Sequence, residues 1–162
     1  MNSKLTVRAI VGTFLSLMLC NCQPAYAGGP AADPCSLLTE VQVSAVLGIN
    51  VDPAKRFPSM CGWSAKQPNS SATKKVALLI INANAFGFAK TPIVSGESVA
   101  PASGICDDAT YSFPTGNKSG SATVLFVKKG NTYFTVHVNG FPDQATAMKT
   151  EKALALDACS KL

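Results

Sequence analysis

His137 is the only histidine in the chain, and its type suits general acid–base chemistry near neutral pH. It lies in a segment, Thr132 to Gly140, in which apolar and polar side chains alternate. Such alternation is typical of a strand with one face exposed to water or to a ligand. Tyr133, Thr135 and His137 share that face. His137 is therefore either a general base or, as we favour, a strand residue on a surface or binding face.

The sequence contains none of the common catalytic or cofactor motifs. It has no G-x-S-x-G elbow, P-loop, calcium loop or dinucleotide fingerprint. Asp107 and Asp108 are adjacent, and adjacent strand residues point to opposite faces, so we expect them to serve a turn or an edge. We therefore expect no cofactor and no metal, and a binding module rather than an enzyme. A hydrolase using His137 and a secreted inhibitor or effector are the alternatives.

Aromatic residues offer further binding candidates. Phe86 and Phe88 flank Gly87 in a segment that reads as a short helix or a loop. They would form an exposed apolar lip or anchor the segment in the core. Trp63 follows Cys61 by two residues, and packing beside a disulfide is favoured over ligand stacking. The predicted ligand-binding residues are Tyr133, Thr135, His137, Phe86 and Phe88.

Residues 1–27 have the three parts of a secretory signal peptide. Lys4 and Arg8 precede an apolar run, and Ala25-Tyr26-Ala27 offers a cleavage site before residue 28. We expect a signal peptide at 1–27 and a single exported domain at 28–162, periplasmic or secreted. The apolar run is too short for a membrane span, and no later segment is long enough.

Of the six cysteines, Cys20 and Cys22 lie inside the predicted signal. Neither follows a small residue, so we favour cleavage after residue 27 over lipid attachment to a membrane. The other four are Cys35, Cys61, Cys106 and Cys159. An even number of cysteines in an exported domain predicts two disulfides.

Four cysteines allow three pairings, of which we favour Cys35–Cys61 and Cys106–Cys159. The first would join the N-terminal helix to the first predicted strand, and the second would join a strand entry to the C-terminal helix. Free thiols or a metal site are the alternatives. The metal site is disfavoured because the four include no C-x-x-C pair.

The charge of the chain gives little indication of a partner. Removal of Lys4 and Arg8 with the signal lowers the formal net charge from +5 to +3. No basic stripe is interleaved with aromatic residues, so nucleic acid is not expected. A small ligand or an envelope protein is the expected partner.

The predicted elements run helix, strands, helix. Residues 34–47 form one helix or two short ones, with capping signals at Asp33 and Thr39 and a stop at Gly48. A near-continuous apolar run at 74–83 predicts a central strand covered on both faces. The other predicted strands are 60–65, 95–99, 107–113 and a hairpin of 121–129 with 132–140, followed by a helix over about 143–160. This order predicts an α+β fold, with an antiparallel sheet packed by an N-terminal and a C-terminal helix.

Three short motifs carry a family resemblance. They are Asp33-Pro34-Cys35-Ser36-Leu37-Leu38-Thr39, Val46-Leu47-Gly48 and Cys61-Gly62-Trp63. Together they resemble a group of small exported bacterial domains that open with a D-x-C-x-L-L-T helix followed by a C-x-W strand. Two later segments, 103–109 and 127–133, resemble the group's G-x-G-D-x-A turn and its hairpin.

The resemblance implies a Cys35–Cys61 bridge and a curved sheet similar to the PsbP-like fold. It implies no reaction, because the group is largely of unknown function, and many of its members are lipoproteins. Cys106 stands where the group usually has glycine, and Cys159 is also additional. Their joint presence supports a second disulfide.

Overall fold

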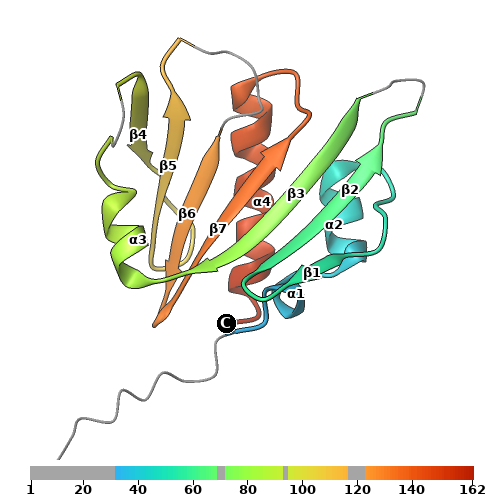
Figure 1. The fold of residues 1–162 in the computed structure, drawn as a ribbon, viewed down its shortest axis with the longest axis horizontal. Coiled ribbons are helices and arrows are strands. Elements are labelled where there is room, and N and C mark those ends of the chain that lie inside the picture. The colour runs from blue at the N-terminus through green and yellow to red at the C-terminus, as the bar shows by residue number, and fades with distance from the viewer. Residues whose placement is uncertain (1–31, 69–71, 93–94, 117–122) are drawn as a thin grey trace, which may run out of the picture.

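Across residues 32–68, 72–92, 95–116 and 123–162, which the computed structural model describes, seven antiparallel strands form one curved, unclosed sheet (Figure 1). Their spatial order is β1-β2-β3-β7-β6-β5-β4. The strands are β1 (Lys55–Phe57), β2 (Met60–Lys66), β3 (Thr73–Ile81), β4 (Glu97–Pro101), β5 (Asp108–Pro114), β6 (Val124–Lys129) and β7 (Thr132–Asn139). The helices are α1 (Pro34–Leu37), α2 (Glu40–Leu47), α3 (Ala83–Phe88) and α4 (Gln144–Cys159).

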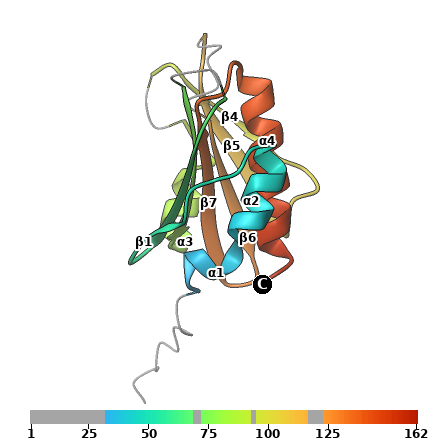
Figure 2. The same ribbon diagram turned by 90° about the vertical axis from the view of Figure 1, so that its right-hand side faces the viewer.

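The helices are divided unequally between the two faces of the sheet. α1, α2 and α4 lie on one face, whereas the short α3 lies on the other, near the β4 edge (Figure 2). The α+β architecture predicted from the sequence, with N-terminal and C-terminal helices against an antiparallel sheet, is confirmed.

Capping side chains define the helix boundaries. Thr39 and Gln42 form the predicted capping box, in which the Thr39 hydroxyl accepts from the Gln42 amide at 3.2 Å. Gly48 ends α2 with a left-handed φ of 68°, a conformation that glycine adopts without strain. Leu38 is extended, so the N-terminal segment is two helices rather than one. Asp143 caps α4 by accepting from the Thr146 amide at 2.8 Å.

The core lies between the sheet and the three helices. Alternate residues of the central strands point into it, and their side chains are almost fully buried. The main contributions from the sheet are Cys61, Trp63, Val76, Leu78, Leu125, Val127, Phe134, Val136 and Val138. The helices contribute Leu37, Val43, Leu47, Ala147, Leu154, Ala155 and Ala158.

Both predicted disulfides are present. Cys35–Cys61 joins α1 to β2 with its Cα atoms 5.1 Å apart, and Cys106–Cys159 joins the β4–β5 connection to α4 with its Cα atoms 6.0 Å apart. Each bridge therefore fixes a helix to the sheet layer, as expected.

One strand was not predicted, and one expectation about another strand was wrong. β1 was not predicted, because a three-residue strand is too short to show a period in the sequence. β3 is central, but it is covered fully on one face only: Ala77 and Leu79 on the other face are half-buried. The six-residue α3 is too short to cover that face along the length of β3.

Candidate functional site

The face of the sheet opposite α1, α2 and α4 is called the open face here. Strand pairing sets its residues in rows that run across the strands. One row consists of Lys55, Gly62, Ala77, His137, Val124, Ser112 and Val99. A neighbouring row consists of Phe57, Met60, Leu79, Thr135, Phe126, Thr110 and Pro101. Any ligand held on this face would contact side chains from these rows.

α3 is anchored to the open face by an aromatic contact and an ion pair. The ring of Phe86 lies 5.5 Å from that of Tyr133 between centroids, and only 5% of Phe86 is exposed. Lys90 lies over the Phe86 ring and pairs with Asp108 on β5. Phe86 therefore acts as an anchor rather than as an exposed lip.

His137 is half-buried on the open face, and neither of its register partners can assist acid–base catalysis. Its register partners are Ala77 on β3 and Val124 on β6. Ser112 is two strands away in the same row, at about 10 Å, since neighbouring strands are separated by about 4.8 Å. This Ser–His distance is too long for a hydrogen bond.

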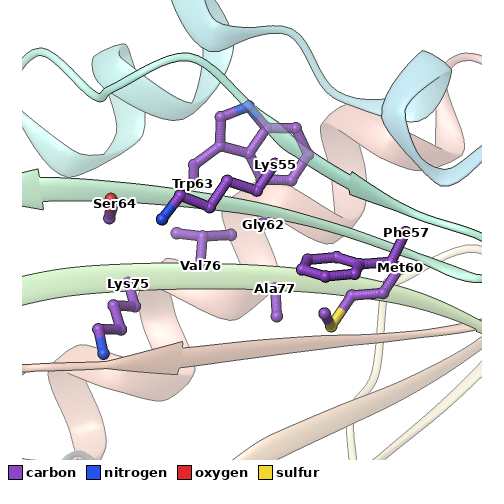
Figure 3. A pocket seen from close by; sticks show the side chains of 9 residues that line it. All are labelled: Lys55, Phe57, Met60, Gly62, Trp63, Ser64, Lys75, Val76 and Ala77. Carbon is purple, nitrogen blue, oxygen red and sulfur yellow. The ribbon is translucent and has the colours of Figure 1, made fainter.

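A hollow of about 390 Å³ lies on the open face over β1, β2 and β3 (Figure 3). We call it the trough. It is lined by Lys55, Phe57, Met60, Gly62, Trp63, Ser64, Lys75, Val76 and Ala77. Its volume lies in the lower part of the range of small-molecule sites.

Small residues form the floor of the trough. Gly62 and Ala77 are paired across β2 and β3, so neither places a long side chain above the sheet at that point. A Cβ atom added to Gly62 would meet only the Val76 carbonyl oxygen within 4 Å, at 3.8 Å. Bulk at position 62 would therefore enter the trough without a clash with the backbone.

The two ends of the trough differ in chemistry. Phe57 and Met60 lie at one end, and the Phe57 side chain is exposed although it is large and apolar (Figure 3). At the other end lie the ammonium groups of Lys55 and Lys75, together with the Ser64 hydroxyl (Figure 3).

The polar end also has an acidic neighbour. The Ser64 hydroxyl donates to the Asp52 carboxylate at 3.0 Å, although Asp52 does not line the trough. Within the described ranges, Lys55 and Lys75 form no ion pair. The two lysines thus outnumber the one carboxylate at this end.

A second hollow, of about 470 Å³, lies between α3 and the β4–β6 part of the open face. Its wall is mostly apolar, and the Ser112 hydroxyl donates to the Glu97 carboxylate there. It is lined by Ala85, Phe88, Ala89, Glu97, Ser112 and Phe126.

The five residues predicted to bind a ligand do not surround one cavity. Phe86 and Tyr133 contact each other, and Thr135 is only 5% exposed. His137 lies beside Ala77 at the edge of the trough but does not line it, and Phe88 lines the second hollow. Their role in binding stays a prediction.

Apart from Trp63, for which the sequence also allows ligand stacking, the residues that line the trough were not predicted to bind a ligand. Lys55 and Phe57 belong to β1, which was not predicted, and Lys75 was assigned to a strand without a functional role. One signal was available at Gly62, since a glycine inside a strand often marks a close approach by another group.

The two other candidates from the sequence have structural roles. Asp107 accepts from the Gly130 amide at 2.7 Å, which, with the nearby Lys129, holds the pKa of its carboxyl below the usual range. Asp107 thus lies in a turn, as expected, and contacts the β6–β7 turn, whereas Asp108 begins β5, which is not an edge strand. Trp63 is 3% exposed and packs in the core beside Cys61, as favoured.

Comparison with protein-family models, with curated proteins and with solved structures finds no match for this chain. The function is therefore inferred from the geometry of the open face.

Proposed function

We propose that this protein is an exported binding module that holds a small ligand in the trough. The observation that carries the proposal is the combination of a recessed floor at Gly62 and Ala77 with an apolar end and a charged end. Small-molecule sites commonly pair a mostly apolar wall with a few polar groups that orient the ligand.

The surroundings of His137 favour binding over hydrolysis. A general base must lie within hydrogen-bond reach of the group that it deprotonates and is usually oriented by a third group. The two register partners of His137, Ala77 and Val124, provide neither a nucleophile nor an orienting group. A hydrolase built around His137 is accordingly the weaker proposal.

Export is supported by the two disulfides, which fit an oxidising compartment. The predicted signal peptide at 1–27 lies outside the described residues, and none of the helices within those residues is long and apolar enough to cross a membrane.

Native mass spectrometry tests this function. The oxidised protein is incubated with a small-molecule extract of a bacterial envelope, desalted and measured intact. Gly62→Val fills the floor of the trough, and Lys66→Val is the matched control because Lys66 lies on the same face of β2 outside the trough.

We expect a small molecule to be retained by the wild type and by Lys66→Val but not by Gly62→Val. Retention of the same molecules by all three proteins would show that binding occurs elsewhere, and no retention by the wild type would contradict the proposal.

A further inference from the structure

We infer that the ligand is a small amphipathic anion, with a single carboxylate-type head and an apolar tail. This inference rests on the proposed function, because it assigns the chemistry of the molecule that the trough holds. It follows from the separation of charge and apolar surface along the trough (Figure 3).

The head group is indicated by the lysines. Lys55 on β1 and Lys75 on β3 approach the Ser64 end from two different strands. Neither forms an ion pair within the described part of the chain, so their charge is available to a ligand. The Asp52 carboxylate accepts a hydrogen bond from the Ser64 hydroxyl, and its negative charge offsets one of the two positive charges. The charge that remains at this end is positive.

The tail is indicated by the opposite end. Phe57 is 52% exposed, and Met60 lies beside it as its register partner, so the two form an apolar surface at this end of the trough. Covering this surface with an apolar tail would remove it from water, which is favourable in proportion to the apolar area covered. Methionine is flexible and polarisable, so it can adapt to tails of different shape.

The distance between the two ends is set by the sheet. Phe57 and Met60 form one register pair, and Ser64 and Lys75 form another, four residues further along β2. Four strand residues span about 13 Å. A linear chain of about eight carbons fits this span, and Gly62 with Ala77 leaves the floor between the ends flat.

Four probes separate head from tail. Octanoate carries both features, octanol lacks the charge, octylammonium reverses it, and acetate lacks the tail. Each is titrated into the oxidised protein, and binding is followed through the amide shifts of Gly62, Ser64 and Ala77 by NMR. We expect octanoate to bind more tightly than octanol, and octylammonium and acetate to bind most weakly. Added salt should weaken the binding of octanoate and leave the binding of octanol unchanged.

Charge variants identify the groups responsible. Lys55→Gln and Lys75→Gln should each weaken octanoate binding by about two- to fivefold, the range for partly exposed charge pairs, with no change for octanol. Asp52→Asn should tighten octanoate binding by a similar factor. Lys66→Gln removes a lysine from the same face of β2 outside the trough and should change nothing.

Failure of this inference and failure of the proposed function give different results. Two results would contradict an anionic ligand and still support the trough as a binding site. In the first, octanol binds at Gly62 as tightly as octanoate. In the second, octanoate binding does not change when Lys55 or Lys75 is replaced. If no probe shifts the amides of Gly62, Ser64 and Ala77, the inference is overturned as well. Native mass spectrometry with Gly62→Val then decides whether the proposed function fails with it.

Discussion

Gly62 couples the stability of β2 to the shape of the trough. A glycine in a strand loses more conformational freedom on folding than other residues do, at a cost of roughly 0.5–1 kcal/mol. It packs no side chain on the open face, and its backbone is not in the left-handed region. No backbone conformation at this position therefore demands glycine.

Gly62→Val should raise the free energy of unfolding by about 0.5–1 kcal/mol while it removes ligand binding. The added side chain favours the strand and occupies the floor of the trough. Urea denaturation of the two oxidised proteins, followed by circular dichroism, measures the change. If Gly62→Val is less stable than the wild type, the floor of the trough has no space for a valine side chain at position 62.

Cys106 is the one non-glycine residue with a positive φ, 47°, among the described residues. A residue with a Cβ atom adopts this conformation at a cost of roughly 1–2 kcal/mol. The bond to Cys159 offsets that cost, because a bridge across 53 residues contributes about 4 kcal/mol in the loop-entropy description.

Two double variants separate these contributions. Cys106→Ala with Cys159→Ala should be less stable than the wild type by a few kcal/mol. Cys106→Gly with Cys159→Ala should recover about 1 kcal/mol, because glycine adopts the left-handed conformation freely. Denaturation midpoints measure both. Equal stability of the two variants would contradict a strained backbone at Cys106.

At the scale of elements, α3 is attached to the sheet mainly through Phe86, while Phe88 points away from the core and is 66% exposed. The two phenylalanines are therefore a matched pair on one short helix. Phe86→Ala should destabilise the protein by about 3 kcal/mol, and Phe88→Ala by less than about 0.5 kcal/mol. Thermal denaturation of both variants provides the comparison. Similar losses of stability in the two variants would contradict the packing of α3 on the sheet through Phe86.

Elements with a local signal in the sequence could be predicted. The capping box at Thr39, the α4 cap at Asp143 and the β6–β7 hairpin depend on residues within a few positions of one another. β1 depends instead on pairing with β2, and its three residues are too few to show the alternation of apolar and polar side chains that marks a strand. The sequence of residues 82–91 is compatible with a helix or a loop, because Gly87 weakens the helix signal there; the structure forms α3 within it.

At the scale of the whole molecule, α4 inserts a carboxyl group between the helix layer and the sheet. Glu151 is fully buried, and one of its carboxyl oxygens accepts from the Thr123 hydroxyl at 3.0 Å and from the Val138 amide at 3.3 Å. Its other oxygen has no hydrogen-bond partner within the described residues. Burial raises the pKa of Glu151 to about 8, although the two donors lower it in part.

Glu151 should make the protein less stable as the pH rises. The unfolded chain loses this proton near its ordinary pKa of 4.5, whereas the folded protein keeps it until about pH 8. Between these values the folded state binds more protons, so the free energy of unfolding falls by up to about 1.4 kcal/mol per pH unit. The loss should level off above pH 8.

Urea denaturation from pH 5 to 9 measures this slope. Glu151→Gln keeps the shape and removes the titration, so its stability should change much less over the same range. The carboxyls of Asp33, Asp107 and Asp143, whose pKa values are lowered by donated hydrogen bonds, titrate below this window. A wild type and a variant with parallel pH profiles would contradict a neutral buried carboxyl.

The trough is also a property of the whole molecule, which is why the sequence did not reveal it. Lys55, Gly62 and Ala77 come from three strands and meet only through pairing. Of the three positions only Gly62 carries a signal in the sequence, as a glycine inside a strand; nothing at Lys55 or Ala77 marks it as a binding residue. His137 drew attention because of its type, yet its neighbours in space determine what it can do.

The most direct test of the central claim is to locate a bound ligand by NMR. Octanoate is added to isotope-labelled, oxidised protein, and nuclear Overhauser effects from its terminal methyl group are measured. Binding in the trough predicts effects to the Met60 methyl group and the Phe57 ring, and none to Phe88. Effects to Phe88 and Phe126 instead would place the ligand in the second hollow and contradict the account.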